Sequence, residues 1–166
     1  MSINQNYLSS VTQIFRSYKS LAEKAMSQTP DEKLFVQMNE DSNSIAMIVQ
    51  HMAGNMLSRW TDFLTTDGEK EWRMRDDEFE VVLRTKDEMV QQWEKGWACL
   101  FSALDSLEAG QLQEIVYIRS EAHTVMEAIN RQVAHYSYHV GQIVLLAKMM
   151  KQGEWNSLSI PKRKKV

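Results

Sequence analysis

Residues that interrupt helices are scarce in this sequence. Only two prolines and six glycines occur among its 166 residues. Proline cannot donate the hydrogen bond that a helix interior needs, and glycine weakens a helix through its conformational freedom. Both prolines, like Gly110 and Gly153, lie between or after segments that show helical periodicity. The sequence therefore favours an all-helical protein.

Cysteine and long apolar runs are also nearly absent. Cys99 is the only cysteine, which excludes an internal disulfide and fits a reducing compartment. No apolar run approaches the roughly 20 residues of a membrane-spanning helix. The start, MSINQNYLSSVTQ, lacks the basic end and apolar stretch of a signal peptide. A net charge of −3 gives no indication of nucleic acid as a partner. We therefore expect a cytoplasmic protein with neither membrane nor nucleic acid as its partner.

Apolar residues recur at helical spacing in four segments of the chain. Steps of three and four residues, which indicate amphipathic helices, occur in residues 3–26, 44–65, 86–108 and 125–151. Capping boxes are predicted at Ser2 with Gln5, Thr85 with Glu88, and Thr124 with Glu127. Residues 65–80 are charged and lack a period, so we expect a surface loop there.

These four segments predict an all-α protein with a four-helix bundle. Its single domain covers residues 1–153, and residues 154–166 form a basic C-terminal tail. The connections between the first and second helices and between the third and fourth are both long enough for extended crossovers. The latter contains a short apolar run, Ile115 to Ile118, that favours an extended chain.

Two of the four histidines lie close together in the last helical segment, in the stretch HYSYHVGQ. His135 and His139 are four residues apart, so they project from one helix face with Cβ atoms about 6 Å apart. Two imidazoles placed in this way can reach one metal ion. Zincins use the same spacing but need Glu after the first histidine, where this chain has Tyr136. A metal site usually has at least three protein ligands, and His51 on the second helix is the obvious third.

The alternative is that these histidines are polar core or rim residues, hydrogen-bonded to their neighbours. Other polar side chains lie on the same faces, within about one turn of the histidines. Asn55, Gln132 and Gln142 could orient the imidazoles or contact a substrate, or they could simply form a polar face of the bundle.

At this point the residues resemble a known family. The stretches RQVAHYSYHVGQIVLLAK, HTVMEAIN and SIAMIVQHMAGNMLSRW resemble the DinB/YfiT-like superfamily of proposed metalloenzymes. Within it, the chain is most similar to a branch of small uncharacterised bacterial proteins. The resemblance covers nearly the whole chain and implies an antiparallel four-helix bundle with a divalent metal in its core. It also implies that His51, His135 and His139 are the metal ligands.

The resemblance implies less about the reaction. Some members of the superfamily transfer low-molecular-weight thiols, such as bacillithiol, to electrophiles. Others are similar to thiol-dependent isomerases of small acids, and many have no assigned reaction. A fold does not determine a substrate. Three imidazoles suit zinc or nickel, and also iron or copper, so the expected cofactor is a divalent metal. The resemblance adds a low-molecular-weight thiol as a second expected cofactor.

Three hypotheses follow. The first is a metal-dependent transferase or hydrolase that acts on a small molecule. The second is a binding or structural protein whose metal only holds the second and fourth helices together, and the third is a metal-free helical dimerisation protein. A homodimer is expected under each of them. For an enzyme, the candidates for acid–base or substrate-binding roles are Tyr138, His123 and Arg131.

Overall fold

The computed structural model describes residues 1–80 and 83–160 of the chain. It contains four long helices, α1 (Ile3–Met26), α2 (Ile45–Trp60), α3 (Lys86–Ser106) and α4 (Val125–Met150). The short elements are three 3-10 turns, η1 (Asp31–Phe35), η2 (Asp76–Phe79) and η3 (Ala109–Gln113), and a hairpin of β1 (Ile115–Ile118) and β2 (Glu121–Thr124). The predicted all-α four-helix bundle is confirmed. The basic end of the predicted tail, residues 161–166, lies outside the described residues.

Side-chain caps fix where the four helices begin. Ser44 caps α2 by accepting a hydrogen bond from the backbone N–H of Met47. The other three helices begin with the predicted capping boxes, in which the Ser or Thr side chain and the Glu or Gln side chain each satisfy a free backbone N–H. The start of each helix is therefore set by side chains at its first turn.

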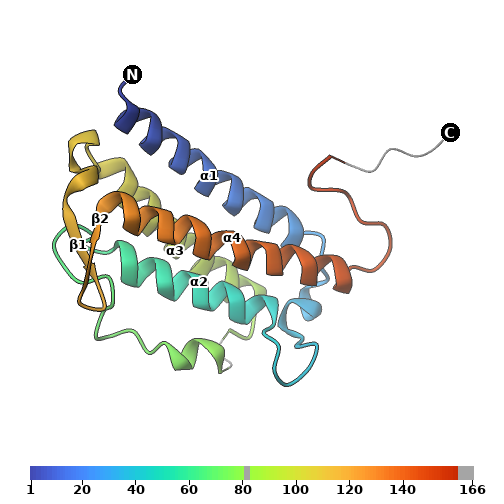
Figure 1. Cartoon of the computed structure of the whole chain (residues 1–166). Coiled ribbons are helices and arrows are strands. Elements are labelled where there is room, and N and C mark those ends of the chain that lie inside the picture. Colours follow the sequence, from blue (N-terminus) through green and yellow to red (C-terminus); the bar gives the residue numbers. More distant parts are fainter. Residues whose placement is uncertain (81–82, 161–166) are drawn as a thin grey trace.

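The helices run in two opposite pairs (Figure 1). α1 and α4 point one way, and α2 and α3 point the other way. Tyr7 near the start of α1 donates to Asn130 near the start of α4, which shows that this pair is parallel. Gly96 of α3 lies against Ala53 of α2, and the two pairs α1–α4 and α2–α3 pack most extensively.

The long crossing connection lies in a different place from the predicted ones. The α1–α2 and α3–α4 connections each join helices at the same end of the bundle. The described residues of the α2–α3 connection, 61–80 and 83–85, lead from one end to the other along α2 (Figure 1). Gly68 donates its N–H to Tyr117 of the hairpin at one end, and Lys86 pairs with Asp31 of η1 at the other. Length alone could not locate the crossover, because the two other connections use their residues for η1, η3 and the hairpin.

The bundle interior is filled by large aromatic side chains. The ring of Phe15 from α1 lies 6.2 Å from Trp60 of α2, 6.4 Å from Trp97 of α3 and 5.8 Å from Tyr136 of α4, measured between ring centroids. All four residues are buried. This aromatic cluster joins all four helices and fixes the relative heights of α2 and α4, which carry the histidines.

Among the described residues, none of the helices has both the length and the apolar character that crossing a bilayer requires.

Candidate metal centre

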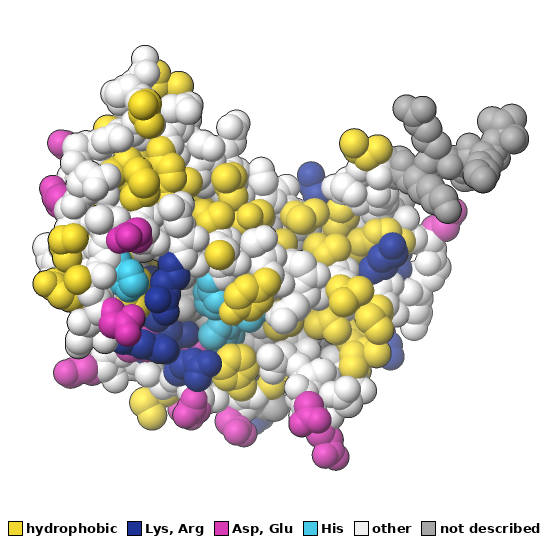
Figure 2. Space-filling model, viewed as in Figure 1, with side chains coloured by type: hydrophobic (Ala, Val, Ile, Leu, Met, Phe, Trp, Pro, Cys, Tyr) yellow, Lys and Arg dark blue, Asp and Glu magenta, His cyan; other side chains and the backbone are white. Residues whose placement is uncertain are grey.

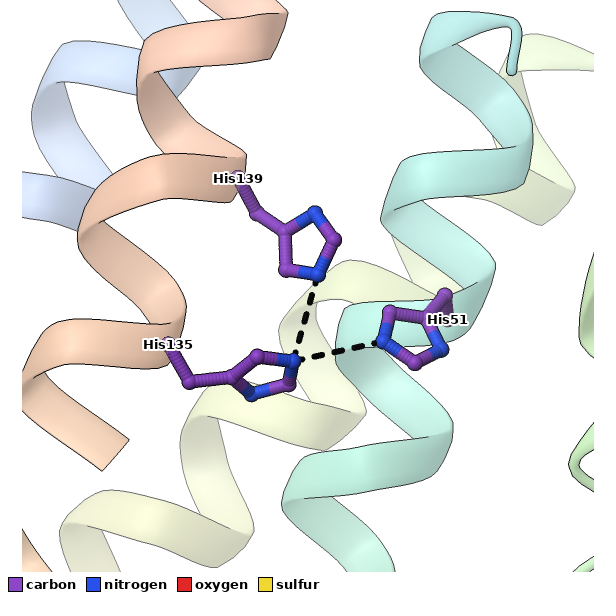
Figure 3. Close-up of side chains that lie close together, drawn as sticks. All are labelled: His51, His135 and His139. Carbon is purple, nitrogen blue, oxygen red and sulfur yellow. Dashed lines mark hydrogen bonds between the residues drawn. The ribbon is translucent and has the colours of Figure 1, made fainter. Parts of the chain in front are cut away.

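Three histidines from two helices meet at one point of the bundle (Figure 3). Nε2 of His135 lies 3.3 Å from Nε2 of His51 and 3.2 Å from Nε2 of His139. The possible ligand atoms of the three residues all lie within 4.8 Å of one another. The structure therefore brings together the three residues that the sequence suggested as ligands, and this cluster could hold a metal ion.

The surroundings keep the two imidazoles of α4 neutral. His51 and His139 are only 5% and 6% exposed, and His135 is partly buried. Burial and, to a smaller extent, the neighbouring imidazoles together lower the pKa of His135 to about 3. Burial also lowers the pKa of His139, to about 4. A neutral imidazole has a free lone pair, which is the form that binds metals.

Hydrogen bonds on the far side of two rings determine which nitrogen carries the proton. Nδ1 of His51 lies 2.8 Å from a carboxylate oxygen of Glu78, and Nδ1 of His139 lies 2.9 Å from Oε1 of Gln142. Both oxygens can only accept, so each Nδ1 must donate its proton. The Nε2 lone pairs of His51 and His139 are therefore left to face the centre of the cluster.

Glu78 is itself held by an arginine. Arg73 donates from Nε and Nη2 to the two carboxylate oxygens of Glu78, at 2.7 and 2.8 Å. Burial raises the pKa of Glu78, but the hydrogen bonds from His51 and Arg73 outweigh this effect, so the net pKa lies below its ordinary value. Glu78 thus stays ionised and remains an acceptor. The ring of Phe79 from the same turn, η2, lies 4.7 Å from the ring of His51 and covers it.

A glycine in α2 makes room for this carboxylate. A Cβ atom on Gly54 would lie 2.2 Å from Oε1 of Glu78 and 2.9 Å from its Cδ. Real Cβ contacts are never this short, so Glu78 could not keep its position beside a larger residue. Glycine in a helix interior costs about 1 kcal/mol relative to alanine. α2 bears this cost at Gly54, because only a residue without a Cβ atom lets Glu78 of η2 lie so close to the helix.

The donor set fits a divalent metal ion. Three Nε2 atoms converge, and those of His51 and His139 present lone pairs without a hydrogen, which can bind a cation that lies between them. Imidazole nitrogens suit zinc, nickel, iron and copper. Within residues 1–80 and 83–160, no Cys, Asp or Glu atom joins this group of possible ligand atoms. A divalent ion held by these three residues alone would keep coordination positions for a water or a substrate.

A cavity of about 350 Å³ opens beside His51 and His135. Figure 2 shows dark blue Lys and Arg side chains gathered beside the cyan histidines on this face. The cavity is lined by residues of α2, the α2–α3 connection, the hairpin turn and α4, namely His51, Asn55, Arg59, Arg73, Arg75, Arg119, Arg131, Gln132, Ala134, His135 and Tyr138. A molecule in it would reach the histidine cluster.

The three amides predicted to surround the histidines have different surroundings. Only Gln142 contacts an imidazole, as an acceptor. Asn55 is buried and accepts a hydrogen bond from the hydroxyl of Tyr136 at 2.9 Å, so it orients that phenol instead of a histidine. Gln132 is 3% exposed and lines the cavity, and its Oε1 has no hydrogen-bond partner.

Of the three candidates for acid–base or substrate-binding roles, two line the cavity and one lies outside it. Tyr138 is 54% exposed and lines the cavity, with its ring 5.3 Å from that of His135. Arg131 lines the same cavity. His123 belongs to β2, where it pairs with Val116, and it is part of neither the cavity nor the histidine cluster.

Sequence reasoning missed Glu78 and Arg73. Both lie within residues 65–80, which were expected to form a surface loop, yet both side chains are buried against the site. The charged stretch has no period that would indicate a buried face. A usable signal was Gly54, because an isolated glycine within a helical pattern, one turn after His51, indicates a close approach by another segment.

The chain also matches a known protein family. A family model described as "Protein of unknown function (DUF1572)" matches residues 2–164. No curated protein matches the chain.

Proposed function

Because this chain belongs to the DUF1572 family of proteins of unknown function, we propose its function from the site: a metal-dependent enzyme that acts on a small molecule. The reaction is a thiol transfer or a hydrolysis. We further propose that the family is a branch of the DinB/YfiT-like superfamily, on the strength of the His-x-x-x-His-Val-Gly-Gln stretch and His51. We also propose that the protein is bacterial, that it lies in the cytoplasm and that it forms a homodimer.

The observation that carries this proposal is a three-histidine cluster that borders a cavity. A structural metal site usually has a closed set of four protein ligands, whereas a catalytic site has three and keeps a position open. Within the described residues, only His51, His135 and His139 offer ligand atoms here. His51 and His135 also line the cavity, so an open position would face a bound molecule.

Each residue of the site has a defined task in such an enzyme. A divalent ion held by the three Nε2 atoms would supply Lewis-acid chemistry, lowering the pKa of a water or thiol that joins it. Glu78 and Gln142 hold the Nδ1 protons of His51 and His139 and so keep Nε2 available. Burial raises the pKa of Tyr138, so its hydroxyl stays protonated at neutral pH and can donate to a substrate oxygen.

Homodimerisation has its own support. Leu145 and Met149 of α4 are 59% and 57% exposed, although both are large apolar side chains. They lie one turn apart and form an apolar strip on the outer face of α4. Pairing with a second copy would remove this strip from water.

The test combines metal content with ligand exchange. Tag-free protein is loaded with zinc, and its metal content is measured by plasma mass spectrometry. We expect one ion per chain. Cobalt-loaded protein is then titrated with 2-mercaptoethanol, and a change in its visible spectrum is expected as the thiol enters an open position. His123→Ala removes a histidine outside the cluster and should change neither result.

Two outcomes would contradict the proposal. Protein that takes up no zinc, nickel or cobalt has no metal centre, and the histidine cluster is then a packing feature. Protein that binds one ion but shows no spectral response to thiols, carboxylates or cyanide has a closed site. In that case the metal serves only to hold α2 and α4 together.

A further inference from the structure

The cavity beside the histidines has an unusual charge. Five arginines line it, and no Asp or Glu is among its lining residues within the described part of the chain. They come from four separate segments, which are α2 (Arg59), the α2–α3 connection (Arg73 and Arg75), the hairpin turn (Arg119) and α4 (Arg131). The whole chain carries a net charge of −3, so this concentration of positive charge is local and does not reflect the composition.

Two of these arginines are already paired in the interior. Arg73 holds Glu78, and Arg59 donates to Glu69 at 3.0 Å and to the backbone oxygen of Gly68. Both guanidinium groups are buried. Glu69 also accepts from Arg119 at 2.8 Å. Arg59 and Arg73 therefore form a guanidinium wall of the cavity, and the carboxylates behind it fix its position and offset its charge.

The other three arginines have donors to spare. Arg119 uses only Nε for Glu69, and its side chain is about half exposed. Arg75 lies 3.6 Å from Asp76, a fully solvated carboxylate that contributes little because water screens the pair. Arg131 is exposed and forms no ion pair with any residue that the structure describes. These guanidinium groups can donate to a ligand without first breaking a strong pair.

A buried polar atom on the same wall also lacks a partner. Oε1 of Gln132 is inaccessible to solvent and accepts no hydrogen bond, although its side chain lines the cavity. Leaving a buried acceptor unpaired costs about 1–3 kcal/mol. Gln132 lies in α4, between Arg131 and the His135–Tyr136 pair. A hydroxyl or amide donor on a ligand would remove that cost once the amide turns toward the cavity.

We propose that this arginine-lined cavity binds the oxyanion group, a carboxylate or a phosphate, of a small acidic substrate, with Arg131 and Arg119 as its main contacts. Guanidinium groups bind both oxyanions through paired N–H donors. A volume of about 350 Å³ is near the lower limit for ligand pockets, so the ligand is a small molecule. Its other end lies against His51 and His135, and this second statement rests on the proposed function.

Calorimetry on tag-free protein tests the inference without any need for metal. Metal-free and zinc-loaded samples are each titrated with succinate, glycerol 3-phosphate and the neutral butane-1,4-diol. We expect saturable binding of one acid per chain and no binding of the diol. The stronger of the two acids identifies the oxyanion as carboxylate or phosphate.

Matched variants localise the binding. Arg131→Gln should weaken acid binding at least fivefold, and Arg119→Asn should do the same while keeping a residue that tolerates the positive φ of 56° at this turn. Lys148→Gln makes the same charge change on an exposed position of α4, 17 residues from Arg131, and should alter the affinity less than twofold. In ¹H–¹⁵N spectra the side-chain amide of Gln132 should shift on binding, while that of Gln28 at the far end of the bundle should not.

The outcomes separate this inference from the proposed function. Acid binding that depends on Arg131 in a protein that takes up no metal would support the arginine cavity and contradict the metalloenzyme. A metal-binding protein with an open position that binds neither acid would contradict the cavity alone. Acid binding that is unchanged in Arg131→Gln and Arg119→Asn would also overturn the inference, because the contacts would then be elsewhere.

Discussion

His139 and His51 are both buried, and both donate Nδ1–H to an oxygen, but their acceptors belong to different parts of the molecule. Gln142 is a neutral, exposed residue one turn further along the same helix as His139. Glu78 is a buried carboxylate in η2, 27 residues from His51, and it is held by Arg73. The α4 half of the site is therefore organised as soon as α4 forms. The α2 half depends on how the α2–α3 connection packs against the bundle.

This difference assigns a positioning role to the α2–α3 connection. Charge-assisted hydrogen bonds are roughly twice as strong as neutral ones, so Glu78 restrains its imidazole more firmly than Gln142 does. Substitution of an acceptor that holds a ligating histidine typically lowers metal affinity 10–100-fold. We therefore expect the two halves of the site to respond differently to substitution, except when a ligand itself is removed.

Removing a ligand should have the largest effect and should be equal for the two halves. His51→Ala and His139→Ala each delete one of three Nε2 donors, so zinc affinity should fall by more than ~100-fold, beyond the range expected for outer contacts. Competition with a chromophoric chelator measures the affinity. If one variant keeps near-native zinc affinity, that histidine is not a ligand. The α2 and α4 halves would then not belong to one metal site.

Substitution of Glu78 should have the next largest effect. Glu78→Gln removes the charge that fixes the His51 proton, and we expect zinc affinity to fall by roughly 10–100-fold. Glu69→Gln is the matched control, because Glu69 also pairs with Arg59 and Arg73 but contacts no histidine. Circular dichroism verifies that both variants are folded before zinc is titrated. Equal losses in the two variants would mean that the connection acts through general stability.

The two helical glycines near the histidines offer a sharper comparison. In Gly54→Ala the new Cβ would overlap Glu78, whereas nothing lies within 4 Å of a Cβ at Gly141 of α4. Gly54→Ala should displace Glu78 and lower zinc affinity by about tenfold, near the low end of the range for outer contacts. Gly141→Ala should raise stability by up to about 1 kcal/mol through helix propensity and leave affinity unchanged. Thermal denaturation and zinc titration together distinguish these results, and matching behaviour of the two variants would contradict the proposed packing.

Gln142→Ala should have the smallest effect. The amide is neutral and exposed, and water can accept the Nδ1–H of His139 in its place. Zinc affinity should fall by less than about tenfold, and the helix should keep its stability because alanine is a better helix former. The same chelator competition measures this loss. A loss as large as that of Glu78→Gln would show that the local acceptor is as important as the distant one.

Much of the fold follows from local signals in the sequence. The capping boxes at Ser2, Thr85 and Thr124 give the helix starts, since they depend on residues only three positions apart. The i, i+4 spacing likewise places His135 and His139 on one face. Helical periodicity predicted how far each helix extends, although the second helix ends at Trp60 and not at the predicted residue 65.

The remainder of the site depends on packing between distant segments. Nothing in residues 65–80 repeats with a helix or strand period, so the burial of Arg73 and Glu78 had no local signature. The lengths of the other two connections left room for crossovers there, but the course of the crossing segment is set by contacts at both of its ends. The cavity combines side chains from four segments, and none of them predicts the other three.

The α2–α3 connection is attached to the bundle at both ends by contacts that do not involve the histidines. Asp67 accepts the backbone N–H groups of Arg119 and Ser120, and beyond the connection Lys86 pairs with Asp31. In evolutionary terms, the sequence of this segment can vary independently of the bundle. Residues between the two attachments can change, one at a time, while the bundle and the two histidines of α4 stay as they are. The part of the proposed acid-binding cavity that this segment lines can therefore vary with no change of fold.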